Sequence, residues 1–482
     1  MKITSIALVA ALAPAFDASS ATITADFSKE IARFRPALHS ASYGPLYERA
    51  HAAFDEQRIR EMNFDFVRTH DLALINCGAR IFDNHFVFPL SGLDATKPEN
   101  YYFEPTDFMV KLMQEMNLKI FYRLGSSIEH TGTNHFNCAI PADFDKVAES
   151  FAGTVRHYAH GWAGGMKDAV QYWEIWNEPD GNNTMWCLPE GDEPWAESPD
   201  ALSAADRAKF ERRRDLFVKF FVTVLKRLKG EFPELKIGGP AMCSMKESWF
   251  RPILRACKKS GLRPDFLSWH CYGNTPDTMF KQVEQAEKMC REEGFEGLEF
   301  INNEWHYIPH TGWYKMNAAT RAPDDANDIN SACYTLQVLS RLQTSRYDQA
   351  YFYGCRHYGN WGYRSYAGNV LNKNFYALKT FGEIKRDCTA ICASSSADTS
   401  ITAFAAKSAD GKKGVLLVSD FCGRGMSISV AAKGLENATN VSARVLSFEK
   451  NLEPVKLRIA DGKFTLHKPD GYSTAFIVTF DL

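Results

Sequence analysis

Eight short, β-rich runs alternate with longer helical patterns between residues 34 and 385, and this alternation limits the possible folds more than any other feature. Each run is nearly continuous in apolar residues, as is typical of strands buried on both faces of a parallel sheet. Eight successive strand–helix units predict an α/β fold, the (β/α)8 or TIM barrel. The predicted strands cover residues 37–42, 64–70, 118–124, 170–176, 235–239, 265–271, 298–303 and 349–354.

The helical patterns between these runs are amphipathic. In the first of them, Phe108, Leu112 and Met116 recur at a spacing of four residues, which predicts one apolar helix face. The span is longer than the roughly 250 residues typical of this barrel, so insertions are expected in the strand-to-helix loops at 71–104 and 181–206. The predicted helices cover residues 105–117, 144–162, 207–230, 248–261 and 329–343.

The pattern of the chain changes after about residue 390. Short segments there alternate apolar and polar residues and are separated by Gly, Asp and Asn turns, which predicts a small antiparallel β-sandwich. The segment TITADF at 22–27 is expected to add a strand to it. We therefore predict a catalytic barrel domain at 22–388 and a β-sandwich domain at 389–482, with a strand contributed from 22–30.

The first 21 residues resemble a secretory signal, with Lys2, an apolar stretch and a small-residue cleavage site at 19–21. This predicts a secreted or periplasmic protein. No later stretch reaches eighteen apolar residues, so no membrane span is expected. A net charge of −2 gives no basic field to attract nucleic acid. The sequence leaves the oligomeric state open.

The twelve cysteines show no CxxC spacing, and the chain has no HExxH motif, so neither a metal site nor a cofactor is predicted. Cys138, Cys187, Cys388 and Cys392 are the better disulfide candidates because their surroundings are polar. Three others fall in predicted strands or helices and are expected to be buried thiols: Cys257, Cys290 and Cys333.

Two carboxylates stand where predicted barrel strands end. The fourth strand runs into Asn177-Glu178, and the seventh into Asn302-Asn303-Glu304. Because active sites of this barrel lie at the carboxyl ends of the strands, Glu178 and Glu304 are expected at one mouth. The plain alternative is that each is a solvated loop residue.

A carboxylate pair at one mouth matches the needs of glycosidic cleavage. One group must be protonated to donate to the leaving oxygen, and the other must be ionised to attack or to activate water. Pro179 is expected to bias Glu178 towards an extended conformation, and the Asn177 amide is placed to hydrogen-bond a sugar hydroxyl.

The ordered motifs VRTHDL, WEIWNEPD, KIGGPA, DFLSWHCYG and FINNEW resemble glycoside hydrolase family 39, a clan A family of β-xylosidases and α-L-iduronidases. The resemblance covers most of residues 30–360, and the family also carries a β-sandwich. It implies that Glu178 is the general acid/base and Glu304 the nucleophile of a retaining enzyme. It also implies substrate or nucleophile contacts for His270 and Tyr272.

Other residues are expected around the pair. Arg68 and His70 end the second strand; Arg68 is expected to hold Glu304 ionised or to be a structural Arg of the barrel interior, and His70 to bind a sugar hydroxyl. Glu174 is expected to make an interior hydrogen bond, and Glu129 receives no role. Three candidate walls of the sugar subsite, each with core packing as the alternative, are Trp305, His306 and Trp361.

The sequence constrains the type of reaction more than the identity of the sugar that is cleaved. A β-xylosidase-type exo-glycosidase is favoured. An α-L-iduronidase would need a cation for the sugar carboxylate, for which Arg356 and Arg364 are candidates. Another clan A enzyme, such as an arabinofuranosidase, and an inactive secreted carbohydrate-binding protein are the remaining alternatives.

Overall fold

The computed structural model describes residues 21–44, 56–71, 80–127, 138–196, 198–309, 327–358, 362–364, 370–423 and 425–482. The expectations for the signal-like segment before Ala21, for Glu129 and for Trp361 lie outside these residues.

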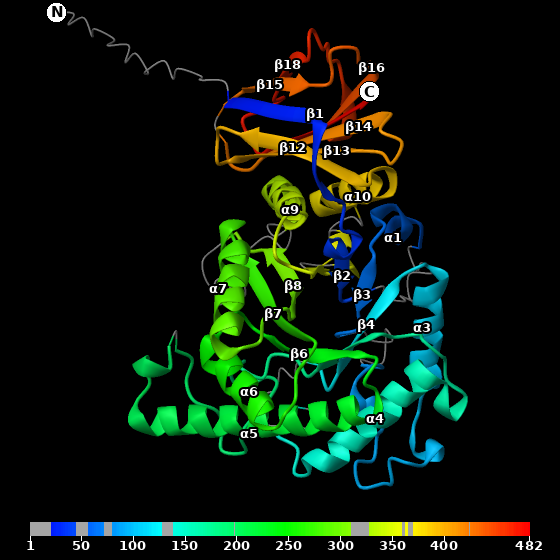
Figure 1. The fold of residues 1–482 in the computed structure, drawn as a ribbon, viewed down its shortest axis with the longest axis vertical. Coiled ribbons are helices and arrows are strands. Elements are labelled where there is room, and N and C mark those ends of the chain that lie inside the picture. Colours follow the sequence, from blue (N-terminus) through cyan, green and yellow to red (C-terminus); the bar gives the residue numbers. More distant parts are fainter. Residues whose placement is uncertain are drawn as a thin grey trace, which may run out of the picture.

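A closed barrel of eight parallel strands forms the larger part of the molecule (Figure 1). Hydrogen bonds between the first and last strands close it, with Ser42 opposite Tyr353. All eight predicted strands are confirmed. They are β2 (Ser40–Ser42), β3 (Phe66–Arg68), β4 (Lys119–Leu124), β5 (Tyr172–Ile175), β6 (Lys236–Met242), β7 (Phe266–Gly273), β8 (Glu299–Tyr307) and β9 (Gln349–Tyr353).

A helix follows each barrel strand, and the five predicted helices are confirmed to within about three residues at each end. The expected apolar stripe through Phe108 is wrong in part: Phe108 is 52% exposed, and the helix buries Met109, Val110 and Met113 instead. The helices are α1 (Glu56–Met62), α2 (Asn84–Val87), α3 (Glu104–Glu115), α4 (Phe144–His160), α5 (Ala204–Glu231), α6 (Glu247–Lys259), α7 (Asp277–Glu293), α9 (Ile329–Leu342) and α10 (Lys373–Asp387).

Alternation along the strands divides the barrel interior into two layers. Because successive side chains point to opposite faces of a strand, Phe66 and Arg68 both point inward, as do Tyr172 and Glu174. The layer at the start of the strands is apolar and contains Phe66, Phe121, Tyr172, Phe266, Ile301 and Tyr351. The layer above it is polar and buried, and it forms the floor of the mouth.

A second, mostly antiparallel sheet lies beyond the barrel and curls over a core of its own. Its order is β17-β16-β19-β14-β13-β12-β1-β15-β18, and only β1 and β15 pair in parallel. Its strands are β1 (Ala21–Arg33), β12 (Ala390–Ser396), β13 (Ile401–Lys407), β14 (Lys413–Asp420), β15 (Ser427–Lys433), β16 (Thr439–Leu446), β17 (Asn451–Val455), β18 (Lys463–His467) and β19 (Thr474–Asp481).

The expected β-rich C-terminal region and the strand contributed by TITADF are both found. The edge strand β17 includes Pro454, which is tolerated there because an edge strand has one side that needs no hydrogen-bond partner. Two short parallel strands, β10 (Arg356–Tyr358) and β11 (Gly362–Arg364), follow β9.

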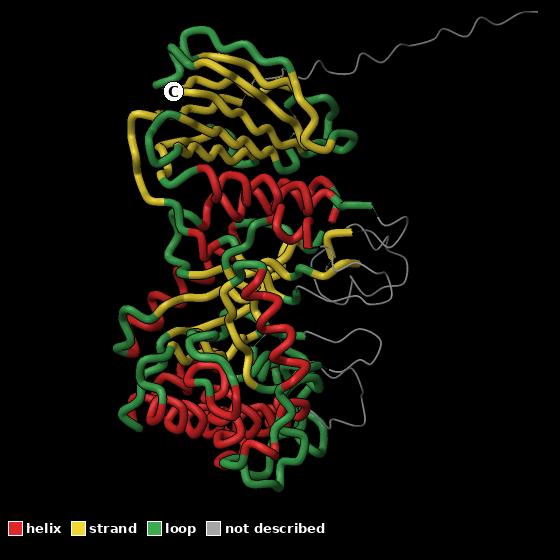
Figure 2. The backbone as a smooth tube through the Cα atoms, turned by 90° about the vertical axis from the view of Figure 1, so that its right-hand side faces the viewer, coloured by secondary structure: helices red, strands yellow, loops and turns green. Residues whose placement is uncertain are grey.

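Helices α9 and α10 lie between the sheet and the barrel, as both views show (Figures 1 and 2). The Gln337 amide on α9 donates to the carbonyls of Ser400 and Ser419 at 2.7 and 3.0 Å, and the Ser419 hydroxyl donates back to Cys333 O. Within the described residues, no helix combines the length and apolarity needed to cross a membrane.

The predicted buried thiols Cys257, Cys290 and Cys333 are found as such. Cys388 and Cys392, which we expected to be disulfide candidates, are unbonded buried thiols in the structure. Cys138 and Cys187 are both buried, and the Cys187 N–H donates to Cys138 O at 2.9 Å.

Candidate active site

Glu178 reaches the barrel mouth through a tight exit from β5. The strand ends at Ile175, and Trp176 takes a left-handed φ of +74° while its indole donates to Met185 O. The ring lies over Gly125, where an added Cβ would come within 2.7 Å of it. Glycine is therefore required at 125 for the chain to turn Asn177 and Glu178 into the mouth.

The expected extended conformation of Glu178 is wrong. Its φ is +43°, in the left-handed region, in spite of Pro179. Two hydrogen bonds override the local preference: the Glu178 N–H donates to Ala241 O on β6 at 2.8 Å, and the Gly181 N–H donates to Glu178 O at 3.0 Å. The residue is held by a turn and a neighbouring strand, at a conformational cost of about 1–3 kcal/mol.

Glu304 reaches the same mouth through a β-bulge in β8. The pairing with β7 shifts by one residue between Trp269 and His270, so that Glu304 lies opposite His270. Bulges of this kind re-aim side chains next to active sites. Asn303 and Glu304 thus both contact groups of the barrel interior, and Trp305 packs in the core.

The two carboxylates face one another across His270. Its Nδ1 lies 2.8 Å from Glu178 Oε1 and 3.4 Å from Glu304 Oε2. One oxygen of each carboxylate and a ring nitrogen of His270 lie within 4.8 Å of one another. The side chains are 17% and 6% exposed, so both carboxylates are largely buried.

Arg68 is fully buried and connects the polar layer to Glu304. Its Nε donates to Glu174, its Nη1 to Glu304 and its Nη2 to Asn177, each at 2.7 Å. Arg68 therefore contacts Glu304, as expected, and is also a structural Arg of the barrel interior, which was the alternative. Glu174 makes the interior hydrogen bonds expected of it, also accepting from Ser268 and Asn303 at 2.6 Å.

The Asn177 amide keeps one buried nitrogen, Nδ2, without a hydrogen-bond partner among the described residues, because Arg68 occupies only its oxygen. A buried donor of this kind costs about 1–3 kcal/mol until a partner arrives. The predicted contact of Asn177 with a sugar hydroxyl needs a free donor of this kind.

His70 and Tyr272 complete the contacts to Glu304. The Tyr272 hydroxyl donates to Glu304 Oε2 at 2.7 Å, and His70 Nε2 lies 3.8 Å from Glu304 Oε1. Arg123 Nε donates to His70 Nδ1 at 3.2 Å, so the ring proton is on Nε2, facing the carboxylate. Arg123 was given no role from the sequence. Its place near the end of the apolar strand LKIFYRL (118–124) matches that of Arg68 in its own strand and is the signal that could have identified it.

Two of the expected sugar-subsite walls lie in the interior. Trp305 is fully buried, with its ring 5.2 Å from that of Phe352 in the hydrophobic core, so packing explains it. His306 is also fully buried, with Nδ1 2.9 Å from Tyr307 O. Burial lowers the pKa of His306 to about 4, which keeps its imidazole neutral.

The environments of the two carboxylates differ in charge. Burial, followed by the nearby charge of Asp180, raises the pKa of Glu178 to about 7. Burial also raises the pKa of Glu304, while the charges of His270 and Arg68 act in the opposite direction. Because Glu304 rather than Glu178 forms the ion pair with Arg68, Glu178 is the better proton donor of the two.

Replacing Arg68 by Met is expected to lower the free energy of unfolding by about 3–5 kcal/mol, because two buried carboxylates lose their cation. Urea denaturation measures this. The matched control is Arg444→Met, which breaks a half-exposed pair with Glu383 (30% and 21% exposed) and is expected to cost at most about 1 kcal/mol. Equal losses in the two variants would contradict the central role of Arg68.

Glu178, His270 and Glu304 also have the spacing of a cation site, since their ligand atoms lie within 4.8 Å. The Arg68 guanidinium 2.7 Å from Glu304 opposes a divalent cation there.

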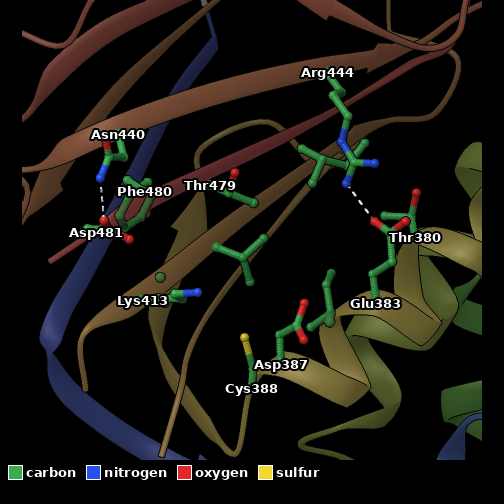
Figure 3. Close-up of a pocket in the computed structure, with 14 residues that line it drawn as sticks. Thr380, Glu383, Asp387, Cys388, Lys413, Asn440, Arg444, Thr479, Phe480 and Asp481 are labelled. Atoms are coloured by element: carbon green, nitrogen blue, oxygen red, sulfur yellow. Dashed lines mark hydrogen bonds and ion pairs between the residues drawn. The ribbon is translucent and has the colours of Figure 1, made fainter. Parts of the chain in front are cut away.

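A separate cavity of about 280 Å³ lies between α10 and the curled sheet (Figure 3). It is lined by residues such as Glu383, Asp387, Lys413 and Arg444, and none of the predicted site residues lines it.

Comparison with known proteins finds glycosidases among the proteins that this chain is similar to. No family model matches the chain. A β-xylosidase from Geobacillus stearothermophilus is 23% identical over 253 residues, which cover 48% of this chain and 41% of that protein. The chain therefore spans less than half the length of that relative.

Two solved structures resemble the whole chain. A glucosidase from Croceicoccus marinus superimposes with a TM-score of 0.70 at 17% identity, covering 96% of this chain and 99% of the other. A thermostable family 51 α-L-arabinofuranosidase from Thermotoga petrophila gives 0.63 at 12% identity, covering 95% and 100%. The protein thus has a clan A glycoside hydrolase-like fold, with a carboxylate pair at the barrel mouth.

Proposed function

We propose that the protein is a retaining glycoside hydrolase that removes a terminal sugar by double displacement, with Glu304 as nucleophile and Glu178 as acid/base. The observation that carries the proposal is that one oxygen of Glu178 lies within 4.8 Å of one oxygen of Glu304. Retaining enzymes hold their carboxyl groups about 5–5.5 Å apart, whereas inverting enzymes need about 6.5–9.5 Å to admit a water.

In the first step Glu304 attacks the anomeric carbon while Glu178 gives its proton to the glycosidic oxygen, and the bond to the leaving group breaks. Tyr272 and Arg68, each 2.7 Å from Glu304, hold its oxygens for attack. In the second step Glu178, now a carboxylate, takes a proton from water, which displaces Glu304. Loss of the Glu304 charge lowers the proton affinity of Glu178 and suits it to this reversal.

For the substrate, we propose a β-xyloside. The sequence similarity to a β-xylosidase supports this, as do the motifs that resemble glycoside hydrolase family 39, to which we propose the chain belongs. The structural likeness to an α-L-arabinofuranosidase makes an arabinofuranoside the second candidate.

A panel of p-nitrophenyl glycosides tests the proposal: β-xyloside, β-glucoside, α-L-arabinofuranoside and α-L-iduronide. We expect fastest release of nitrophenol from the β-xyloside. Fastest turnover of the arabinofuranoside would support the second candidate. Absence of turnover on every member would overturn the enzymatic proposal in favour of a carbohydrate-binding protein.

The elevated pKa of Glu178 predicts the high-pH limb of the activity profile. Glu178 must be protonated for the first step, so kcat/KM is expected to fall as the pH rises through about 7. Asp180→Asn removes the negative charge that raises this pKa and leaves Lys246, now 2.7 Å from an amide, uncompensated. Both changes lower the pKa of Glu178, so the limb is expected to move to lower pH.

Asp265→Asn is the matched control for this variant. Like Asp180, Asp265 pairs with a lysine and accepts from a backbone N–H, here Lys229 at 2.9 Å and Ile237 at 2.8 Å. It stands just before β7, at the opposite end of the barrel from the mouth. The control should keep the wild-type limb, and an unmoved limb in Asp180→Asn would contradict the assignment of Glu178.

We also propose that the protein is exported, on the strength of the signal-like first 21 residues. Expression of the full chain in a bacterium with a secretion pathway, followed by fractionation, tests this. Shortened protein in the periplasm or medium is the expected result, and full-length protein retained in the cytoplasm would contradict it.

A further inference from the structure

Asp71 is a charged side chain beside the carboxylate pair that the mechanism above does not use. It follows His70 at the mouth end of β3, and its exposure is only 9%. Its φ of +58° lies in the left-handed region. The chain thus accepts both burial of a carboxylate and an unfavourable backbone conformation at this position, a combination that points to a function.

The contacts of Asp71 leave one oxygen unused. Oδ2 lies 3.3 Å from His70 Nε2 and accepts from the Tyr353 hydroxyl at 3.2 Å. Oδ1 is buried and has no hydrogen-bond partner among the described residues. Arg80 contacts Asp71 through the backbone instead: its Nη1 donates to the Asp71 carbonyl oxygen at 3.1 Å, not to Oδ1.

The same contacts place Asp71 next to Glu304. His70 Nε2, which lies 3.3 Å from Asp71, is also 3.8 Å from Glu304 Oε1, so one imidazole atom faces both carboxylates. Tyr353 is near both as well, since the negative charges of Asp71 and Glu304 add to burial in raising its pKa. A sugar with its anomeric carbon at Glu304 therefore has its ring hydroxyls within reach of this cluster.

We infer that Asp71 Oδ1 accepts a hydrogen bond from a ring hydroxyl of the sugar bound between Glu178 and Glu304, and thereby helps to determine which sugar is cleaved. The inference rests on the proposed function. A buried acceptor without a partner is costly until a donor arrives. A hydroxyl is such a donor, whereas a sugar carboxylate facing Oδ1 would be repelled by it.

The test compares kcat/KM for the p-nitrophenyl glycoside that the wild-type chain cleaves fastest with kcat/KM for its monodeoxy analogues. Asp71→Ala is expected to lower kcat/KM for the full sugar by about 10- to 100-fold, the usual loss for a hydrogen bond to a charged group. For the analogue that lacks the contacted hydroxyl, the same variant should change kcat/KM by less than about threefold.

Asp71→Asn keeps the shape of the side chain. It is expected to show a smaller loss of kcat/KM that depends on the same hydroxyl. This variant replaces Asp71→Ala in the test if the Ala variant does not fold. Asp420→Asn, at a buried acid paired with Lys468 in the curled sheet, controls for general destabilisation and should keep wild-type kinetics. Thermal melting of each variant checks its folding.

The outcomes separate this inference from the proposed function. Equal losses on every analogue would show that Asp71 acts only through His70, and unchanged kinetics would show no role; either result overturns the inference alone. If the wild-type chain cleaves no glycoside, the proposed function is overturned, and this inference with it.

Discussion

Replacing Glu304 by Gln is expected to lower kcat by about 10⁴- to 10⁶-fold, the scale seen when a nucleophile that acts together with its partners is removed. The amide keeps the shape of the side chain, so the hydrogen bond from Tyr272 at 2.7 Å remains possible. Substrate binding should therefore persist. Steady-state kinetics on the aryl glycoside and calorimetry with the free sugar measure the two quantities.

Glu299→Gln is the matched control, because Glu299 lies on the same strand, β8, at its opposite end. Its carboxylate pairs with Lys236 at 2.9 Å and accepts from Tyr172, so it too is a hydrogen-bonded acid. We expect wild-type kcat from this control. Near-normal turnover by Glu304→Gln would remove Glu304 from the mechanism.

Replacing Glu178 by Ala is expected to lower kcat by about 10²- to 10⁴-fold on substrates with poor leaving groups, the usual contribution of general acid–base catalysis. A dinitrophenyl glycoside needs no proton for departure, so its first step should survive. The second step loses its base, and a burst of dinitrophenol followed by slow turnover is the expected time course.

Azide should rescue the second step, because this anion attacks the glycosyl-enzyme without a general base. The expected product is a glycosyl azide with the configuration of the substrate. Equal losses on good and poor leaving groups, with no effect of azide, would show that Glu178 supports the fold of the mouth rather than proton transfer.

Much of the barrel was predictable because its determinants are local. Short apolar runs alternate regularly with amphipathic helices along the chain. In a closed parallel barrel, a carboxylate at the carboxyl end of a strand lies at the mouth. Glu178, Glu304 and Asn177 therefore emerged from the sequence. Arg68 did so as well, because a charged residue inside an apolar strand needs a partner.

The remaining site residues depend on features that no short motif displays. The bulge in β8 directs Glu304 inward and leaves Trp305 to the core, and a strand read with strict alternation cannot show this. The left-handed backbone at Glu178 depends on a hydrogen bond to Ala241, which lies on another strand. Asp71 was hidden for a similar reason, since its partner Tyr353 is 282 residues away.

The central claim, that Glu178 and Glu304 act as a retaining pair, is tested most directly by the configuration of the first product. Proton NMR of the hydrolysis of an aryl β-D-xyloside should show the β-anomer of xylose first, with the α-anomer appearing only at the rate of mutarotation. Initial formation of the α-anomer would contradict the claim, because it requires a single displacement by water.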